Sequence, residues 1–489
     1  MENGMGLYRP SMALLTDLYQ LTMAYGYWKS DMKKTESVFH LFFRENPFGG
    51  GYAIACGLQY VIDFIKDFRL QDDDIAFLRT LTGNDEKLLF DEEFLTFLSE
   101  LEFSCDVDAI PEGTVVFPQE PLLRVTGPLI QCQLLETALL NMINFQTLIA
   151  TKASRICIAA QGDPVLEFGL RRAQGIDGAL TASRAAYIGG CTATSNVLAG
   201  KMFGIPVKGT HAHSWIMSFD TEMESFRAYA AAMPNNTVFL VDSYNTLEGV
   251  KKAITVGHEL RKEGYEMAGI RLDSGDLAYL SIEARKLLDA ANFTKAVIVA
   301  SNDLDEKIIS RLKKEGATIG VWGVGTNLIT AKDQPALGGV YKLSAIREAG
   351  KEWQYRMKFS DDVLKISNPG ILQVRRFEDE QGYIADVIYH QKPEGEKTVV
   401  AMVDPIDKSK RHHLSSQEIS EDLLKPIFRK GKLVYKESSL EEIRTLRRIS
   451  LKKFQNGVKS LAQPENYSVG LEKALHELKI NLMKQKGLK

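Results

Sequence analysis

One strand–helix–strand unit decides the fold, and it occupies residues 238–276: VFLVDSYNTLEGVKKAITVGHELRKEGYEMAGIRLDSGD. Two short apolar runs, Val238–Val241 and Ala268–Leu272, have the length and composition of buried strands. The stretch between them, Thr246–Glu263, carries apolar residues at helical spacing. Buried strands that alternate with helices of this length predict parallel strands joined by right-handed crossovers.

The same alternation extends in both directions, over residues 165–327. The other predicted strands are Val165–Leu170, Pro206–Gly209, Ala296–Ala300 and Thr318–Val324, and further helices are predicted over Leu277–Asn292 and Leu304–Glu315. A series of this length favours a closed parallel (β/α) barrel, with an open parallel sheet as the alternative.

The flanking segments have a different pattern. Residues 107–127 contain a Pro-Glu-Gly turn and predict two short strands, Thr114–Phe117 and Leu122–Val125, that form a sheet apart from any helical core. A long helical pattern follows over 129–160, and strands are predicted again near Gly370–Phe377 and Tyr383–Tyr389. Near the end, leucines at helical spacing predict a helix docked by its apolar face.

Bulk composition excludes several classes of protein. The chain has 489 residues with 45% hydrophobic and 25% charged, enough for a large catalytic domain and one or two satellites. A net charge of −3 provides no overall attraction for nucleic acid or membrane. Five unpatterned cysteines, an N-terminus without signal-peptide features and a Thr137–Thr151 run too polar and short for a span together predict a cytoplasmic protein.

Polar side chains gather where the predicted strands end. These clusters are Arg171-Arg172, residues 210–214, Asp242-Ser243, residues 271–276, residues 301–303 and residues 323–327. In a parallel barrel the carboxyl ends of the strands share one face, which carries the active site. A helix N-cap is the better explanation for Asp303 or Ser243 alone, but the clusters together indicate one site for an anionic, phosphorylated substrate.

Two of these clusters suggest specific ligands. The backbone of GVGT (323–326), with Thr326, can cradle a phosphate, although an ordinary tight turn is the alternative. Arg271 suits a planar carboxylate or a phosphate, whereas Asp242, Asp273 and Asp276 suit Mg²⁺ or ribose hydroxyls. A surface ion pair is the plainer alternative for RLDSGD.

The histidine pair at 211 and 213 allows a metal-dependent hydrolase, because H-x-H on a strand places both imidazoles on one face. Such sites recruit later histidines, and His258, inside a predicted helix, is the only one between 214 and 330. A nucleophile or general base beside the phosphate loop is therefore favoured.

At these residues the chain strongly resembles the nicotinate phosphoribosyltransferase family. The matching motifs are LLTDLYQLTMAYGYW (14–28), PEGTVVFPQEPLLRVTGPL (111–129), EFGLRRAQG (167–175), GTHAHSWIMSF (209–219), DSYNTLEG (242–249), RLDSGDLAYLS (271–281) and GVGTNL (323–328). The resemblance implies transfer of phosphoribosyl from 5-phosphoribosyl 1-diphosphate to nicotinate in NAD salvage, with hydrolysis of ATP and with Mg²⁺. It also implies a homodimer whose active site is shared across the interface.

The resemblance implies an α/β fold with an irregular, type II phosphoribosyltransferase-like (β/α) barrel. We expect an N-terminal α+β sandwich domain at 1–130, to which part of 340–400 returns. The barrel would occupy 131–340, and an α-rich extension would occupy 401–489.

Roles for individual residues also follow from the resemblance. His213 matches the histidine that ATP phosphorylates transiently, and Asp242 and Asp273 match acidic positions near ribose and Mg²⁺. The nicotinate-binding positions are Tyr19 from the partner subunit, Phe168, Thr210, Ser214 and Arg271, of which Arg271 would pair with the carboxylate. The 5′-phosphate positions are Arg171, Gly323, Gly325 and Thr326. His211 stays open between core packing and a hydrogen bond that supports the site.

Three rival functions remain. Nicotinamide phosphoribosyltransferase resembles the chain more faintly, and its pocket Asp aligns approximately with Asn196, which would not repel a carboxylate. A zinc hydrolase predicts stoichiometric zinc, and a non-catalytic phosphate sensor predicts gaps in the site.

Overall fold

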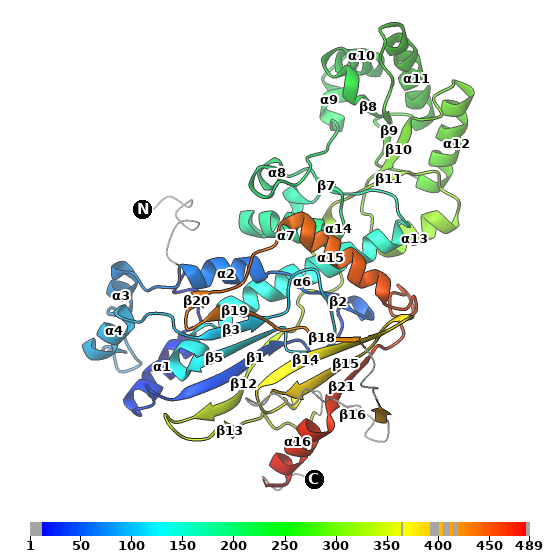
Figure 1. Cartoon of the computed structure of the whole chain (residues 1–489). Helices are drawn as coiled ribbons and strands as arrows, with labels where there is room; N and C mark the ends of the chain where they lie inside the picture. Colours follow the sequence, from blue (N-terminus) through cyan, green and yellow to red (C-terminus); the bar gives the residue numbers. More distant parts are fainter. Residues whose placement is uncertain (1–11, 363–364, 392–400, 404–410, 414–418, 486–489) are drawn as a thin grey trace. The chain divides into compact units, whose positions relative to one another are not determined.

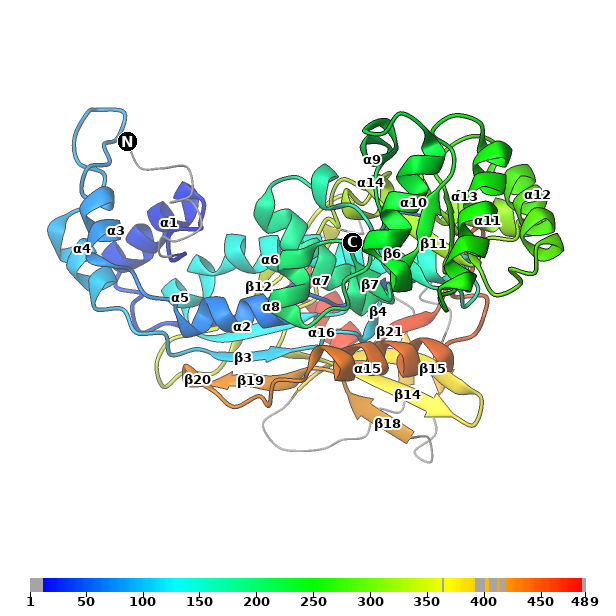
Figure 2. The same ribbon diagram turned by 90° about the horizontal axis from the view of Figure 1, so that it is seen from above.

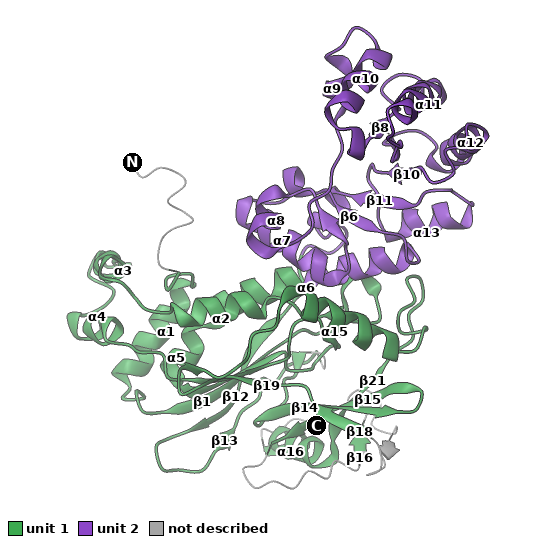
Figure 3. Ribbon diagram, turned by 45° about the horizontal axis from the view of Figure 1, so that its top comes forward, with its two compact units in different colours: residues 1–147, 336–489 green, residues 148–335 purple. Residues whose placement is uncertain are grey.

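The computed structural model describes residues 12–362, 365–391, 401–403, 411–413 and 419–485, so the predictions for the first eleven residues lie outside it. The chain forms two compact units, residues 1–147 with 336–489 and residues 148–335 (Figure 3). The long helix α6 (Glu136–Ala159) belongs to both units.

The second unit is the alternating α/β region. Its strands are β6 (Val165–Glu167), β7 (Ala193–Thr194), β8 (Val238–Leu240), β9 (Gly269–Leu272), β10 (Val297–Ala300) and β11 (Val321–Val324). Its helices are η3 (Leu170–Arg172), α7 (Ile176–Gly189), α8 (Val197–Phe203), α9 (His213–Met217), α10 (Glu222–Ala232), η4 (Pro234–Asn236), α11 (Thr246–Lys262), α12 (Leu277–Ala290), α13 (Glu306–Lys314) and α14 (Thr326–Ile329).

The strands of this unit pair in the order β7-β6-β11-β10-β9-β8, and every pairing is parallel. The predicted parallel arrangement is therefore confirmed. Helices α10, α11 and α12 lie side by side, with α11 packed between the other two (Figure 1). Capping side chains start the longer helices: Asn245 accepts a hydrogen bond from Glu248 N, and Asp276 accepts one from Tyr279 N.

The predicted strand Pro206–Gly209 is reduced to one parallel bridge between Thr194 and Val207. Pro206 cannot extend the pairing because it has no N–H to donate. Two hydrogen bonds with Thr194 are described here: Thr194 N donates to the Pro206 carbonyl, and Lys208 N donates to the Thr194 carbonyl. Strand β6 likewise ends at Glu167 instead of Leu170, because the chain turns into η3 after Gly169.

The first unit contains two larger sheets and a two-stranded ribbon. One sheet has the order β13-β12-β1-β5-β3-β19-β20, the other β17-β16-β21-β15-β14-β18, and the ribbon pairs β2 with β4. The strands are β1 (Glu36–Phe42), β2 (Ala53–Ile54), β3 (Asp106–Ala109), β4 (Val115–Val116), β5 (Leu123–Pro128), β12 (Val340–Arg347), β13 (Gln354–Tyr355), β14 (Leu372–Asp379), β15 (Gly382–His390), β16 (Ala401–Val403), β17 (Arg411–His413), β18 (Ile419–Asp422), β19 (Lys425–Arg429), β20 (Lys432–Leu433) and β21 (Ser468–Glu472).

The helices of the first unit are α1 (Leu18–Lys29), η2 (Pro47–Gly49), α2 (Leu58–Lys66), α3 (Asp72–Leu78), α4 (Glu92–Ser99), α5 (Leu129–Leu134), α15 (Leu440–Lys453) and α16 (Lys473–Gln485). The last residue of α15, Lys453, pairs with Glu378 of β14, and Figure 2 shows the helix in orange. Residues 401–489, predicted as an α-rich extension, thus contain strands β16–β21 as well as two helices. Leu475 of α16 is fully buried, as the leucine spacing predicted.

A buried group of charges lies in the second sheet of this unit. Arg376 and Asp386 form an ion pair of 2.5 Å, and neither side chain is exposed by more than 1%. Glu120, also fully buried, accepts a hydrogen bond from Phe117 N, and burial beside Asp386 holds the pKa of Glu120 well above its usual range. The neutral form of this carboxyl group is therefore favoured in the folded protein.

Candidate active site

His213 lies at the start of α9, beside the carboxyl end of β8. Its Nε2 is 3.2 Å from Oδ1 of Asp242, the second residue after β8. The imidazole is 40% exposed, whereas the Asp242 carboxylate is fully buried. When Nε2 carries the proton donated to Asp242, the lone pair of Nδ1 is free to act as a nucleophile.

Asp242 is fixed by two further hydrogen bonds. Its Oδ2 accepts from the backbone N–H of Asp273 at 2.7 Å and from the hydroxyl of Ser274 at 2.7 Å. Because Asp273 and Ser274 follow β9, this carboxylate connects the ends of the neighbouring strands β8 and β9. Its own position is therefore fixed, and it can hold His213 in one orientation.

Arg271 collects a second set of predicted residues. Its guanidinium donates to Thr210 Oγ1 at 3.0 Å, to Ser301 Oγ at 2.8 Å and to Asp273 Oδ1 at 3.0 Å. Its centre is 5.9 Å from the centroid of the Phe168 ring, and its side chain is 15% exposed. The structure thus brings together five residues, from the ends of β6, β9 and β10 and from the segment after the bridge at Val207.

The hydrogen bonds of Arg271 limit how it can bind a ligand. Together with a 3.4 Å bond to the carbonyl of His211, they engage four of its five N–H donors. A bidentate pair with a carboxylate therefore requires at least one of these acceptors to give up its bond to the guanidinium, and the 3.4 Å bond to the His211 carbonyl is the longest of them.

His211 lies beside the site and helps to hold it together. Its Nε2 accepts a 3.4 Å hydrogen bond from Leu240 N of β8, and its ring meets Tyr229 edge-on. Burial, reinforced by the positive charge of Arg271, lowers the pKa of His211 to about 4. The ring is therefore neutral and links the 206–213 segment to β8.

The glycine loop after β11 packs closely on Phe168. A Cβ on Gly323 would lie 2.7 Å from the Phe168 ring, and one on Gly325 would lie 3.3 Å from the Phe168 carbonyl. Phe168 N also donates to Val324 O at 2.8 Å. Glycine is thus needed here for close approach, and the loop leads directly into Thr326 at the start of α14.

Arg171 lies on η3 and lines a cavity of about 490 Å³ between η3, α7 and α8. Asn196 lines the same cavity, but its side chain is occupied: it accepts from Ala199 N as the N-cap of α8 and donates to Ser183 Oγ. The other cavity walls are mainly apolar side chains such as Leu170, Ile176 and Val197.

Two predicted nicotinate-binding residues are not joined to this network. Tyr19 belongs to the first unit, on α1, where its side chain is 49% exposed. Ser214 follows His213 on α9, and its carbonyl accepts a hydrogen bond from Ser218 Oγ.

One residue that sequence reasoning missed is Glu167, the last residue of β6. It is fully buried, and it accepts hydrogen bonds from Gly169 N, from Ser183 Oγ at 2.9 Å and from Thr194 Oγ1 at 2.6 Å. The available signal was a carboxylate placed directly between an apolar strand and the Phe-Gly turn.

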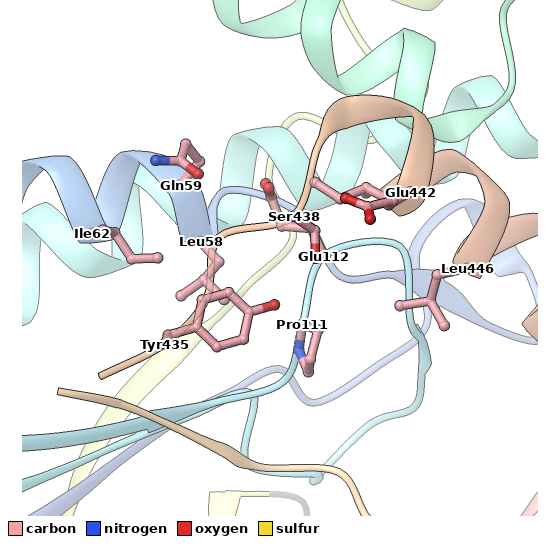
Figure 4. Close-up of a pocket in the computed structure, with 10 residues that line it drawn as sticks. Leu58, Gln59, Ile62, Pro111, Glu112, Tyr435, Ser438, Glu442 and Leu446 are labelled. Carbon is pink, nitrogen blue, oxygen red and sulfur yellow. The ribbon is translucent and has the colours of Figure 1, made fainter. Parts of the chain in front are cut away.

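A smaller cavity in the first unit has a different character. It measures about 90 Å³ and is lined by Glu112, Tyr435, Ser438 and Glu442 together with apolar side chains (Figure 4). A water molecule occupies roughly 30 Å³, so this cavity has room for water and none for a nucleotide.

Across the described residues, no group of three or more His, Cys, Asp and Glu side chains is arranged to hold a metal ion. The described helices also include none that is long and apolar enough to cross a membrane. The longest of them, α6, carries Lys152 and Arg155, which pair with Glu306.

The fold and the site define an α/β enzyme of phosphoribosyl transfer. Models of the nicotinate phosphoribosyltransferase N-terminal domain, family and C-terminal domain match residues 14–144, 164–377 and 371–479. The chain belongs to the nicotinate phosphoribosyltransferase family, and it is an enzyme of NAD salvage.

Individual relatives agree over the whole length. The chain is 43% identical to nicotinate phosphoribosyltransferase of Bacillus subtilis over 472 residues, covering 94% of this chain and 93% of that protein. The structure of human nicotinic acid phosphoribosyltransferase superposes with a TM-score of 0.83 at 34% identity, covering 96% of this chain and 100% of the human one. A nicotinate-nucleotide pyrophosphorylase from Pyrococcus furiosus shares the fold, with a TM-score of 0.68 at 23% identity over 93% and 98% of the two chains.

Proposed function

We propose that the enzyme couples phosphoribosyl transfer to ATP through a phosphohistidine at His213. The overall reaction converts nicotinate, 5-phosphoribosyl 1-diphosphate, ATP and water into nicotinate mononucleotide, diphosphate, ADP and phosphate. The observation that carries the proposal is the His213–Asp242 pair, in which a buried carboxylate holds Nε2 of a half-exposed imidazole. Nδ1 attacks the γ-phosphorus of ATP, ADP leaves, and water later hydrolyses the N–P bond.

A phosphate on His213 changes the charge of the site by nearly two units. Such a change alters the affinity of a site that contains Arg271, Asp242 and Asp273 for anionic substrates, so ATP hydrolysis drives substrate binding and product release.

Transfer itself needs no strong base, because the pyridine nitrogen of nicotinate has a free lone pair at neutral pH. That nitrogen forms a bond to ribose C1 as the bond from C1 to diphosphate breaks. The main barrier is the positive charge that develops at C1, which nearby carboxylates such as Asp242 and Asp273 stabilise.

The remaining residues divide into a nicotinate group and a phosphate group. Arg271 pairs with the nicotinate carboxylate beside Thr210 and Ser214, and the pyridine stacks between Phe168 and Tyr19 of the partner subunit. Arg171, Gly323, Gly325 and Thr326 hold the 5′-phosphate; the close packing of Gly323 on Phe168 supports a shared pocket.

Asp273 or Asp242 would hold Mg²⁺, which would supply charge neutralisation for the diphosphate leaving group. Of the two candidate ligands, Asp273 fits better: both oxygens of Asp242 already accept hydrogen bonds, whereas those described for Asp273 reach only Oδ1. Mg²⁺ commonly uses one or two carboxylates plus phosphate and water, so a larger protein cluster is unnecessary.

We further propose the finer architecture that the family implies: a closed (β/α) barrel at 131–340, a sandwich domain at 1–130 and an extension at 401–489, assembled as a cytoplasmic homodimer. The link from His211 to Leu240 supports closure, because it joins the 206–213 segment to β8 at the far end of the ladder.

The proposal is tested by measuring nicotinate mononucleotide formed from nicotinate or nicotinamide with 5-phosphoribosyl 1-diphosphate and Mg²⁺, with and without ATP. His213→Ala should abolish ATP hydrolysis and acid-labile phosphorylation while it retains some ATP-independent transfer. Failure to form the mononucleotide under any condition would sink the proposed reaction. Unchanged phosphorylation of His213→Ala would instead refute the role of this histidine.

A further inference from the structure

We propose that Glu167 is a positioning residue that holds Phe168 and Arg171 in their binding geometry. The inference rests on the substrate-binding roles proposed for those two residues. Glu167 touches neither the reacting atoms nor the predicted ligands, but it precedes Phe168 directly and fixes the turn that leads to Arg171.

The first observation is that Glu167 acts only as an acceptor. One oxygen receives the Gly169 N–H, and the other receives the hydroxyls of Ser183 and Thr194. These three donors belong to the turn after β6, to α7 and to β7. One buried carboxylate therefore ties together the turn that leads to Arg171, the helix α7 that lines the Arg171 cavity, and β7.

The second observation is that the turn has no room to move away from Glu167. A Cβ on Gly169 would lie 2.5 Å from Cβ of Ile329 on α14. Gly169 is thus confined between Glu167 and the helix that follows the glycine loop. A shift of this turn away from Glu167 would therefore push on α14 and displace the glycine loop that precedes it.

The third observation connects the network to Asn196. Thr194 Oγ1 accepts from Asn196 N at 3.0 Å and donates to Glu167. Ser183 Oγ accepts from Asn196 Nδ2 at 3.2 Å, and its one proton is shared between Glu167 and the carbonyl of Ala179, both at 2.9 Å. An Asp at 196 could not donate to Ser183. Two carboxylates would then compete for the single hydroxyl proton of Ser183.

Glu167→Gln is the main test, because an amide has nearly the same size but must place an NH₂ where the carboxylate accepts. This NH₂ group would face either the Gly169 N–H or the hydroxyls of Ser183 and Thr194, so that one set of hydrogen bonds to the carboxylate is lost. We expect the KM for 5-phosphoribosyl 1-diphosphate and for nicotinate to rise about tenfold or more, with kcat within about threefold of wild type.

Glu306→Gln is the matched control. Glu306 is an equally buried carboxylate of the same unit, paired with Lys152 and Arg155. This variant should lower the thermal unfolding midpoint at least as much as Glu167→Gln and leave both KM values near those of wild type. An equal rise of KM in both variants would show that Glu167 contributes stability alone and would overturn the proposal.

Two further variants keep the test decisive if Glu167→Gln folds poorly. Thr194→Val removes one donor at constant size and should raise the same KM values by a smaller factor. Asn196→Asp should raise them as well, and Glu167→Gln should relieve part of that effect in the double variant. KM values within twofold of wild type in Thr194→Val, or additive effects in the double variant, would refute the network. A wild-type enzyme that forms no mononucleotide would instead refute the proposed function.

Discussion

The side chains at the carboxyl ends of β8 and β9 are connected to one another and to neighbouring residues by hydrogen bonds. Asp242 orients His213 and accepts from the residues after β9, while Arg271 connects Thr210, Asp273 and Ser301. Substitution at one of these positions therefore frees donors or acceptors at several others. The consequences depend on which bond the ligand replaces.

Arg271→Ala should raise the KM for nicotinate by roughly 10- to 150-fold, because a charge-assisted hydrogen bond contributes about 1.5–3 kcal/mol. Arg271→Lys should recover only part of this loss, since an ammonium lacks the planar fork. Steady-state kinetics with nicotinate as the varied substrate measure both effects.

Arg227→Ala is the appropriate control, because Arg227 forms an exposed ion pair with Glu259 in the same unit. Its kinetics should match those of wild type. Retention of normal nicotinate turnover by Arg271→Ala would contradict the assignment of the carboxylate partner.

At the scale of elements, the sequence predicted five of the parallel strands, β6, β8, β9, β10 and β11, and the helices α11, α12 and α13 to within a few residues. It did not predict β7 or the shorter helices α7, α8, α9, α10 and α14. It could not predict which strand ends would meet, because Arg271 and Thr210 are 61 positions apart and their contact depends on strand order. Glu167 was missed for a related reason: a carboxylate after an apolar run resembles an exposed cap, and only α7 and β7 bury it. The strand predicted at 206–209 does not form, because Pro206 lacks the N–H that a longer ladder would need. The hydrophobic pattern alone did not show this.

The loop between β11 and α14 provides an element-scale prediction. Gly323→Ala places a methyl group 2.7 Å from the Phe168 ring, so the ring and the loop must separate. We expect the KM for both substrates to rise about tenfold, by loss of about 1.4 kcal/mol of binding. Gly320→Ala, where a Cβ meets nothing within 4 Å, should leave both values unchanged.

Strands β14 and β15 provide a prediction about pH. The raised pKa of Glu120 means that the folded state retains a proton that the unfolded state loses. This stabilisation is complete below the ordinary pKa of a glutamate and is lost as pH rises through the raised value. In the wild type, hydrogen exchange of β14 and β15, corrected for intrinsic rates, should therefore accelerate as pH rises above the ordinary titration range of a glutamate.

Glu120→Gln keeps the neutral form at every pH and should remove most of this acceleration. Glu92→Gln, which alters an exposed pair with Arg79, should behave as wild type over the same range. Equal acceleration in wild type and Glu120→Gln would contradict the protonated state of Glu120.

At the scale of the whole molecule, the proposed nicotinate site takes Arg271 from one subunit and Tyr19 from its partner. In a two-fold dimer with shared sites, a mixture of Tyr19→Ala and Arg271→Ala subunits contains hybrids with one intact site. Random exchange should restore about a quarter of the wild-type activity.

Phe168→Ala mixed with Arg271→Ala is the control for subunit exchange, because both residues lie in the same unit and no hybrid site is intact. Activity should stay at the level of the separate variants. Absence of recovery in the Tyr19 mixture, after exchange is verified by mass, would mean that each subunit completes its own site.

The first unit is built from both ends of the chain: Glu36 of β1 pairs with Arg347 of β12, 311 positions later. During translation at about 5–20 residues per second, β1 waits roughly 15–60 s for this neighbour. The intervening unit has all its strands by then and can fold on the ribosome first. Newly made β1 and β3 meanwhile present open edges that β12 and β19 cover later, so chaperone demand and premature termination after residue 335 should be the main hazards of making this protein.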